Sequence, residues 1–303
     1  MRYLEVGGAR ISRIGLGTWQ FGSNEWGYGA AYAGGVAGRL VVRALDLGIN
    51  LIDTAEIYGF GRSEKIVGAA LGSRRPEAFL ATKVFPVLPL APIVRQRARS
   101  SARRLRTDVL DLYQVHWPNP VVPIGTTMAG MRGLMEAGLV RHAGVSNFGM
   151  PQWLAADAAL GRPVLANQVR FSLLALRPLL HLVPFAQREG RIIIAYSPLA
   201  QGLLSGRYDG TRQPVGVVRR RNPFFMHPEL YQVLMDALRE LAAAHRATPS
   251  QIALAWLIRQ PNVVAIPGAS SERQLDENAA AADIELTNAD AEMLFSAAMG
   301  LST

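Results

Sequence analysis

The chain has 303 residues, of which 50% are hydrophobic and 18% charged, a composition typical of a globular domain that buries its own core. It contains no cysteine, which excludes disulfides and thiolate metal sites, and no apolar run approaches the roughly 18 residues of a membrane helix. We therefore expect a single domain spanning residues 1–303, located in the cytoplasm, with neither a membrane partner nor a metal.

The predicted elements begin with YLEVGGARI, residues 3–11, which predicts a β-hairpin that turns at Gly7 and Gly8. One unit then repeats along the chain: a short apolar run rich in β-formers, a loop and a helical pattern. The predicted strands span residues 14–19, 49–53, 78–84, 110–116, 141–146, 163–169, 191–197 and 262–268. The predicted helices span residues 36–47, 63–71, 90–105, 124–137, 151–160, 178–189, 228–259 and 271–282.

Strands that are apolar on both faces, each followed by a helix, favour a parallel sheet covered by helices. Eight such strands close a barrel, so the predicted α/β fold is a (β/α)8 TIM barrel whose N-terminal β-hairpin caps the bottom. The alternative is an open doubly wound sheet. The sequence disfavours it, because no GxGxxG turn joins a strand to a helix.

The net charge of +9 raises the question of nucleic acid, and residues 95–106 hold the densest basic run. On a helix, Arg95, Arg99 and Arg103 share one face while apolar residues share another, which indicates an amphipathic helix with a solvated basic side. No zinc-finger spacing or RNA-binding aromatic motif accompanies the run, so we expect no nucleic acid partner. The basicity would suit a phosphorylated small molecule.

Lysine is rare, since 30 of the 32 positive residues are arginine and only Lys65 and Lys83 are lysine. Lysine is a compact point charge that changes protonation more readily than arginine, so Lys83, at the end of a predicted strand, calls for an explanation. Chance survival of the two lysines is the alternative.

Four chemically active side chains stand at or just beyond successive predicted strand ends: Asp53, Tyr58, Lys83 and His116. In a parallel barrel these ends meet at one mouth. We expect Lys83 to lower the pKa of the Tyr58 phenol and Asp53 to orient the ammonium. His116 would place a substrate oxygen against the tyrosine hydroxyl.

Such a group gives a proton to a carbonyl oxygen or takes one from an alcohol. It contains no nucleophile, so the missing reagent must come from a cofactor. Each of these residues alone could be a cap, a core residue or a surface residue. Four of them at successive strand ends make coincidence a weak explanation.

Motifs along the chain support this chemistry: NLIDTAEIYGFGRSEKIVG, LATKV, DLYQVHWP, GVSNF, NQV, AYSPLAQGLLSGRY and IPGASSERQLDEN. In this order they resemble the aldo-keto reductase superfamily, from Leu4 to about Leu286, nearest in style to the branch that contains potassium-channel β subunits and bacterial relatives. The resemblance implies a (β/α)8 barrel and NADPH-dependent reduction of aldehydes and ketones. It also implies a catalytic tetrad with Tyr58 as general acid, made of Asp53, Tyr58, Lys83 and His116.

The resemblance further implies how NADP(H) would bind. Ser146, Asn147 and Gln168 match positions that hydrogen-bond the nicotinamide carboxamide, and Tyr196 matches the aromatic residue that stacks on the ring. Residues 197–208 match the loop that covers the pyrophosphate.

At the adenosine end, Ser270 and Gln274 match positions at the 2′-phosphate, with Arg273 adjacent, so NADPH is expected over NADH. A simply capped helix is the alternative for the serines. The complete set of implied cofactor residues is Thr18, Trp19, Ser146, Asn147, Gln168, Tyr196, Ser197, Pro198, Leu199, Gln201, Gly202, Arg207, Gly268, Ser270, Arg273, Gln274, Glu277 and Asn278.

The expected partner is a small-molecule carbonyl substrate, in a pocket that Trp19, Trp26, Tyr58, His116 and Trp117 would line. For the tryptophans, rigid loop packing is the alternative. The basic segment 209–226 would either close over the cofactor or form a solvated loop.

A second interpretation of the whole chain is a redox sensor or accessory subunit that binds NADPH but turns over little, as channel β subunits do. Multiple-turnover consumption of NADPH would separate the two interpretations. The physiological carbonyl, the favoured direction and the oligomeric state, a homo-oligomer included, stay open at this point.

Overall fold

Eight parallel strands pair in chain order into one sheet, and its two edge strands come together. The structure, a computed structural model, describes residues 1–22, 32–208, 219 and 222–300. Ile14 pairs in parallel with Ala265, and the Gly15 N–H donates to the Ala265 carbonyl at 2.8 Å, which closes the barrel. The strands are β3 (Leu16–Gly17), β4 (Leu51–Asp53), β5 (Phe79–Val84), β6 (Leu110–Val115), β7 (Val140–Ser146), β8 (Ala166–Arg170), β9 (Ile192–Tyr196) and β10 (Val263–Ala265).

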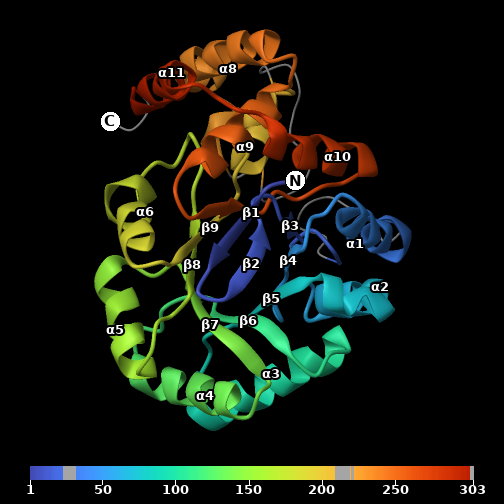
Figure 1. Cartoon of the computed structure of the whole chain (residues 1–303), viewed down its shortest axis with the longest axis vertical. Helices are drawn as coiled ribbons and strands as arrows, with labels where there is room; N and C mark the ends of the chain where they lie inside the picture. Colours follow the sequence, from blue (N-terminus) through green and yellow to red (C-terminus); the bar gives the residue numbers. More distant parts are fainter. Residues whose placement is uncertain (23–31, 209–218, 220–221, 301–303) are drawn as a thin grey trace.

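The predicted (β/α)8 barrel is therefore confirmed, and the open doubly wound sheet is wrong. Helices form a ring outside the strands (Figure 1). The α-helices are α1 (Ala37–Asp46), α2 (Arg62–Leu71), α3 (Ala91–Leu105), α4 (Ile124–Glu136), α5 (Met150–Leu160), α6 (Pro178–Arg188), α8 (Gln232–Ala244), α9 (Pro249–Arg259), α10 (Glu272–Ala280) and α11 (Asn288–Met299). Shorter helical turns are η2 (Tyr32–Val36), η3 (Gly72–Glu77), η4 (Ala200–Ser205), η5 (Pro223–Phe225), η6 (Pro228–Tyr231) and η7 (Ala281–Asp283).

The single helix predicted over residues 228–259 is wrong, because the chain breaks between α8 and α9. Arg246 has φ 52, which leaves the helical region, and Thr248 then caps α9 through a reciprocal pair of hydrogen bonds with Gln251. Pro249 at the first position of α9 has no N–H to continue the preceding helix.

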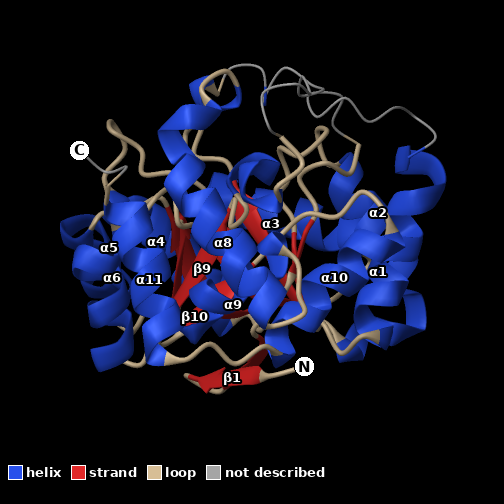
Figure 2. Ribbon diagram, turned by 90° about the horizontal axis from the view of Figure 1, so that it is seen from above, coloured by secondary structure: helices blue, strands red, loops and turns tan. Residues whose placement is uncertain are grey.

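The predicted N-terminal hairpin is confirmed as β1 (Tyr3–Val6) paired antiparallel with β2 (Ala9–Ser12). Gly7 and Gly8 have φ 59 and 79, the left-handed values that a two-residue type I′ turn requires. The hairpin lies across one end of the barrel, opposite the end at the top of Figure 2. Its buried side chains join those inside the barrel: Leu4, Ala9, Ile11, Leu51, Phe79, Ala81, Leu112, Leu165, Ala166, Ile192, Ile194, Val264 and Ile266.

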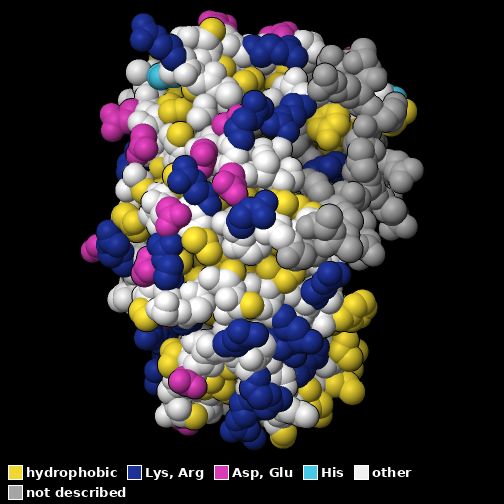
Figure 3. Space-filling view, turned by 90° about the vertical axis from the view of Figure 1, so that its right-hand side faces the viewer, with side chains coloured by type: hydrophobic (Ala, Val, Ile, Leu, Met, Phe, Trp, Pro, Cys, Tyr) yellow, Lys and Arg dark blue, Asp and Glu magenta, His cyan; other side chains and the backbone are white. Residues whose placement is uncertain are grey.

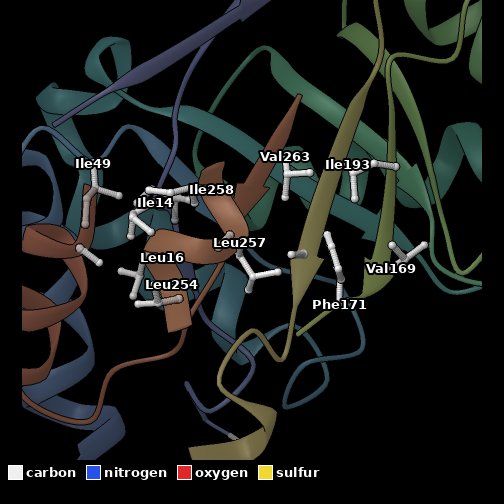
Figure 4. Close-up of a cluster of buried hydrophobic side chains, with 14 of the residues drawn as sticks. Ile14, Leu16, Ile49, Val169, Phe171, Ile193, Leu254, Leu257, Ile258 and Val263 are labelled. Atoms are coloured by element: carbon white, nitrogen blue, oxygen red, sulfur yellow. The ribbon is translucent and has the colours of Figure 1, made fainter. Parts of the chain in front are cut away.

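A second apolar layer lies between the strands and the helices. Figure 4 shows part of it, where Leu254, Leu257 and Ile258 of α9 lie beside Ile14 and Val263. All five side chains are buried. Each strand thus meets apolar side chains on both faces, which explains why its sequence reads as a continuous apolar run rather than an alternating one.

The surface carries arginine and carboxylate side chains intermixed (Figure 3). On α3, Val94 and Ala98 are buried while Arg99 and Arg103 are exposed, so the predicted solvated basic side is confirmed. Within the described residues, no helix is long and apolar enough to cross a membrane.

Candidate active site

A cavity of about 950 Å³ opens at the end of the barrel away from the hairpin. Its walls come from the last residues of the strands and from the loops that follow them, as in other barrels of this type. Asp53, Tyr58 and His116 line it, and Lys83 lies buried beneath them. The predicted convergence of the four side chains on one mouth is what the structure shows.

Lys83 and Asp53 form a fully buried ion pair at the base of the site. The Lys83 ammonium donates to Asp53 Oδ2 at 2.6 Å, to the Thr54 carbonyl at 2.8 Å and to the Tyr58 hydroxyl at 3.4 Å. Its three N–H donors thus have three oxygen partners. Buried charges of this kind are tolerated only when paired and hydrogen-bonded, so this lysine is held in one position under the phenol.

The second carboxylate oxygen of Asp53 is also engaged. Asp53 Oδ1 accepts from Gln168 Nε2 at 2.7 Å and, more weakly, from Gln114 Nε2 at 3.5 Å. Strand register brings Gln114 beside Lys83, and Gly144 leaves room for it, since a Cβ there would lie 2.8 Å from Gln114 Cγ. Gln114 was not predicted, although its place two residues before His116 puts it on the inward face of β6.

Burial, reinforced by the negative charge of Asp53, raises the pKa of Tyr58 well above its ordinary value of 10. The net shift is thus opposite to the one expected from Lys83. Burial of the phenol and the nearby Asp53 carboxylate raise the pKa by more than the Lys83 ammonium, 3.4 Å from the hydroxyl, lowers it. At neutral pH Tyr58 is a phenol with a proton to give.

Burial and the nearby Lys83 ammonium lower the pKa of His116 to about 3, so its imidazole is neutral at neutral pH. Within the described part of the chain its buried Nδ1 has no hydrogen-bond partner. An unpaired lone pair costs less there than an unpaired N–H, so we place the proton on Nε2.

Aromatic rings surround the Tyr58 hydroxyl. Trp19 stacks on Tyr58 with ring centroids 6.0 Å apart, and Tyr58 meets His116 edge to face at 5.8 Å. His116 in turn stacks with Trp117 at 6.4 Å and meets Phe85 edge to face at 6.1 Å. The structure thus brings together four of the five predicted substrate residues.

The fifth predicted substrate residue, Trp26, lies outside the described residues. Most of the predicted segment 209–226 also lies outside the described residues. Of its arginines Arg219 is described: it lines the cavity, and its Nε donates to the Gln201 carbonyl at 3.2 Å.

The predicted carboxamide residues form one hydrogen-bonded network on the neighbouring wall. Ser146 Oγ donates to the Gln168 carbonyl at 2.9 Å, and Asn147 Nδ2 donates to Ser146 Oγ at 3.0 Å and to the His116 carbonyl at 3.2 Å. The Tyr196 hydroxyl donates to Asn147 Oδ1 at 3.0 Å. We call Ser146, Asn147 and Gln168 the amide wall. The hydrogen bond from Asn147 to the His116 carbonyl connects it to the residues around Tyr58.

The remaining predicted cofactor residues line the same cavity with one exception. Arg273 does not line it; its side chain is 80% exposed and pairs with Glu277 at 3.3 Å. The Ser270 hydroxyl and backbone N–H both donate to Gln274 Oε1 at 2.8 Å, at the start of α10. The predicted cofactor residues that do line the cavity are Thr18, Trp19, Ser146, Asn147, Gln168, Tyr196, Ser197, Pro198, Leu199, Gln201, Gly202, Arg207, Gly268, Ser270, Gln274, Glu277 and Asn278.

Several lining residues were not predicted. Phe85 had the clearest signal in the sequence, because it follows the β5 strand two residues after Lys83. Others come from loops, whose course past the cavity no local pattern reveals. The residues missed include Gln20, Ile57, Phe60, Arg62, Phe85 and Ser250, whereas Ser205 and Tyr208, which also line the cavity, fall within the predicted loop 197–208.

A partly buried ion pair joins the loop that carries Tyr58 to the loop after β5. The Glu56 carboxylate accepts from the Phe85 N–H at 2.5 Å and pairs with Arg97 at 2.7 Å. Arg97 Nη1 donates to the Phe85 carbonyl at 2.7 Å. Glu56 and Arg97 thereby hold Tyr58 and Phe85 in fixed relation on either side of His116.

Among the described residues, no group of three or more histidine, aspartate and glutamate side chains is placed to hold a metal ion.

Comparison with known proteins agrees with the geometry. The model of the Aldo/keto reductase family matches residues 13–298. An oxidoreductase of Mycobacterium tuberculosis is 55% identical over 301 residues, which cover 98% of this chain and 93% of the relative. The thermostable aldo-keto reductase Tm1743, solved with the inhibitor epalrestat, is 34% identical with a TM-score of 0.84, over 98% of this chain and all of that one.

A further solved structure, an aldo/keto reductase from Klebsiella pneumoniae in complex with NADP and acetate, is 33% identical with a TM-score of 0.77. The match covers 96% of this chain and 93% of that one. By sequence and by fold, the chain belongs to the aldo/keto reductase family of oxidoreductases.

Proposed function

We propose that the protein reduces aldehydes and ketones to alcohols with NADPH, and that Tyr58 is the proton donor. The observation that carries the proposal is the Tyr58 hydroxyl, 3.4 Å from the buried Lys83 ammonium at the mouth of a cavity large enough for a cofactor and a substrate. A phenol beside a fixed cation is neutral before the reaction and stabilised as an anion once its proton has left.

The neutral His116 would donate from Nε2 to the carbonyl oxygen and hold it against the Tyr58 hydroxyl. The oxygen takes the tyrosine proton, the Lys83 ammonium stabilises the phenolate, and water returns the proton to Tyr58. NADPH would supply the hydride that the carbonyl carbon receives, since no side chain of the site offers one. Proton and hydride together convert the carbonyl to an alcohol.

The residues of the cavity fit NADPH. The amide wall of Ser146, Asn147 and Gln168 suits a carboxamide, which both donates and accepts hydrogen bonds, and Tyr196 offers a flat face to the ring. Arg207 and the start of α10 offer positive charge and N–H donors to phosphates. The Klebsiella relative crystallised with NADP supports this assignment.

Preference for NADPH over NADH stays a prediction. Ser270 and Gln274 line the cavity at the start of α10, and we assign them to the 2′-phosphate. A phosphate there would compete with Glu277 for the Arg273 guanidinium, which is exposed enough to turn toward it.

The test is a turnover count. With excess NADPH and an aldehyde, we expect each protein molecule to form many molecules of alcohol in stoichiometric yield with NADP⁺. The redox-sensor interpretation predicts instead a single equivalent of oxidised cofactor that dissociates slowly. A single burst of this kind, without further turnover, would favour the sensor and contradict the reductase.

A further inference from the structure

Large apolar side chains stand exposed around the substrate side of the mouth. Phe60, on the loop after β4, is 91% exposed, and Val121, on the loop after β6, is 84% exposed. Trp117 is exposed on the same loop as Val121, and Val87 and Leu88 are exposed on the loop after β5. We call this set the apolar rim: Phe60, Val87, Leu88, Trp117 and Val121. Figure 3 shows apolar side chains gathered at the lower right edge of the molecule, on the side where the loops after the strands lie.

Two residues of the rim are held in a backbone conformation that suits neither of them. Phe60 has φ 53 and Leu88 has φ 45, the left-handed region that bulky side chains rarely adopt. Their exposed side chains contribute little to the core, so burial does not compensate for the strain. A glycine or an asparagine would make the same turns with less strain, so the presence of bulky side chains there indicates a contact outside the core.

The rim meets the proposed active site at two of its five residues. Phe60 and Trp117 line the same cavity as Tyr58, and the Trp117 ring stacks on His116. The rim therefore begins where the carbonyl would be bound, which favours the substrate as its occupant over an unrelated partner.

Hydrogen bonds connect the loops of the rim to one another. Asn119 Nδ2 donates to the Pro86 carbonyl at 2.8 Å, and Glu56 binds the Phe85 N–H. A smaller cavity of about 340 Å³, whose walls include Val121, opens on the loop after β6. Apolar surface thus extends beyond Trp117 on loops that are connected by hydrogen bonds.

We propose that the substrate is a carbonyl compound with an extended aliphatic chain, whose carbonyl lies at Tyr58 and whose chain runs outward over the apolar rim. The inference rests on the reductase function proposed above. It predicts a preference for chain length, because each methylene laid on the rim leaves water.

The first measurement compares straight-chain aldehydes from propanal to decanal with NADPH. We expect kcat/KM to rise by about twofold to fourfold per methylene, the upper figure corresponding to full burial of a CH₂ group. The gain should lie mainly in KM, since binding of the chain does not change between ground state and transition state.

The second measurement uses Phe60→Asn. Asparagine adopts the left-handed region more readily than phenylalanine, so the variant should have a Tm equal to or above that of the wild type. Relative to the wild type, its kcat/KM should fall more for longer aldehydes and reach about a tenfold loss for decanal. This figure assumes that the ring covers some three methylenes, each of which contributes about twofold. Higher stability with lower activity cannot be explained by unfolding.

Leu180→Asn on α6 and Val233→Asn on α8 are matched controls, since these side chains are 69% and 70% exposed and lie away from the rim. Both should keep the chain-length dependence of the wild type. Equal kcat/KM for propanal and decanal in the wild type would overturn the rim inference and leave the reductase function intact. If none of the aldehydes causes NADPH to be oxidised, both the rim inference and the reductase function are wrong.

A second copy of the chain is the competing occupant of the rim. If the wild type sediments as a dimer that Phe60→Asn dissociates, the rim is a subunit interface and the inference is wrong. A sedimentation coefficient that Phe60→Asn leaves unchanged, together with the chain-length effect, supports the substrate.

Discussion

Replacement of Tyr58 by phenylalanine is expected to lower kcat for carbonyl reduction by about 10²- to 10⁴-fold, the usual contribution of a positioned general acid. The aromatic ring stays, so its contacts with Trp19 and His116 are kept and only the hydroxyl is lost. The dissociation constant of NADPH should therefore change little. Steady-state oxidation of NADPH and a fluorescence titration of the cofactor measure the two quantities.

Tyr113→Phe is the matched control for this prediction. Tyr113 lies fully buried on β6, and its hydroxyl has no hydrogen-bond partner in the described ranges. Loss of that hydroxyl should leave kcat unchanged. If Tyr58→Phe reduces aldehydes as fast as the wild type, the proton comes from another group and the assigned role is wrong.

Lys83→Met is expected to destabilise the protein by about 3–5 kcal/mol, because removal of one partner leaves a buried charge without its counter-ion. Asp53 would keep the amide donors of Gln168 and Gln114 but lose the ammonium at 2.6 Å. Reduction should be lost as well, since no cation remains to stabilise the Tyr58 phenolate. Urea unfolding and steady-state kinetics measure the two effects.

The other lysine provides the control. Lys65 is exposed on α2, and Lys65→Met should change the free energy of unfolding by less than about 0.5 kcal/mol. The double variant Asp53→Asn/Lys83→Met removes both buried charges, so it should regain most of the stability while staying inactive. An unfolding midpoint for Lys83→Met equal to that of the wild type would show that the pair is not held as described.

Most of the fold could be predicted because its signals are local. Apolar runs located all eight barrel strands, and adjacent glycines located the hairpin turn at Gly7 and Gly8. The errors lie where a cap interrupts a helical pattern. Thr248, Pro249 and Gln251 end one helix and start another, and Thr287 caps α11, a helix that was not predicted.

The tetrad could be predicted because strand ends converge in a barrel, whatever the detailed register. Gln114 and Phe85 have positional signals in the sequence, but their contacts could not be predicted, since these follow from register and from the packing of loops. The direction of the Tyr58 pKa shift also needs the three-dimensional structure. It depends on how far the phenol is buried and on how close the Asp53 carboxylate lies to it.

The pH dependence of kcat/KM for a small aldehyde, at saturating NADPH, tests the central claim most directly. Tyr58 must be protonated to act, and its pKa lies well above 10, while His116 must be neutral, and its pKa is about 3. The account predicts a flat profile from about pH 5 through neutrality, since neither group titrates in that range. Burial lowers the pKa of Lys83, so a loss of activity at still higher pH would report loss of its ammonium. A loss of activity as pH falls through 6.5, the ordinary pKa of histidine, or as it rises through neutrality, would contradict a neutral imidazole beside a protonated phenol.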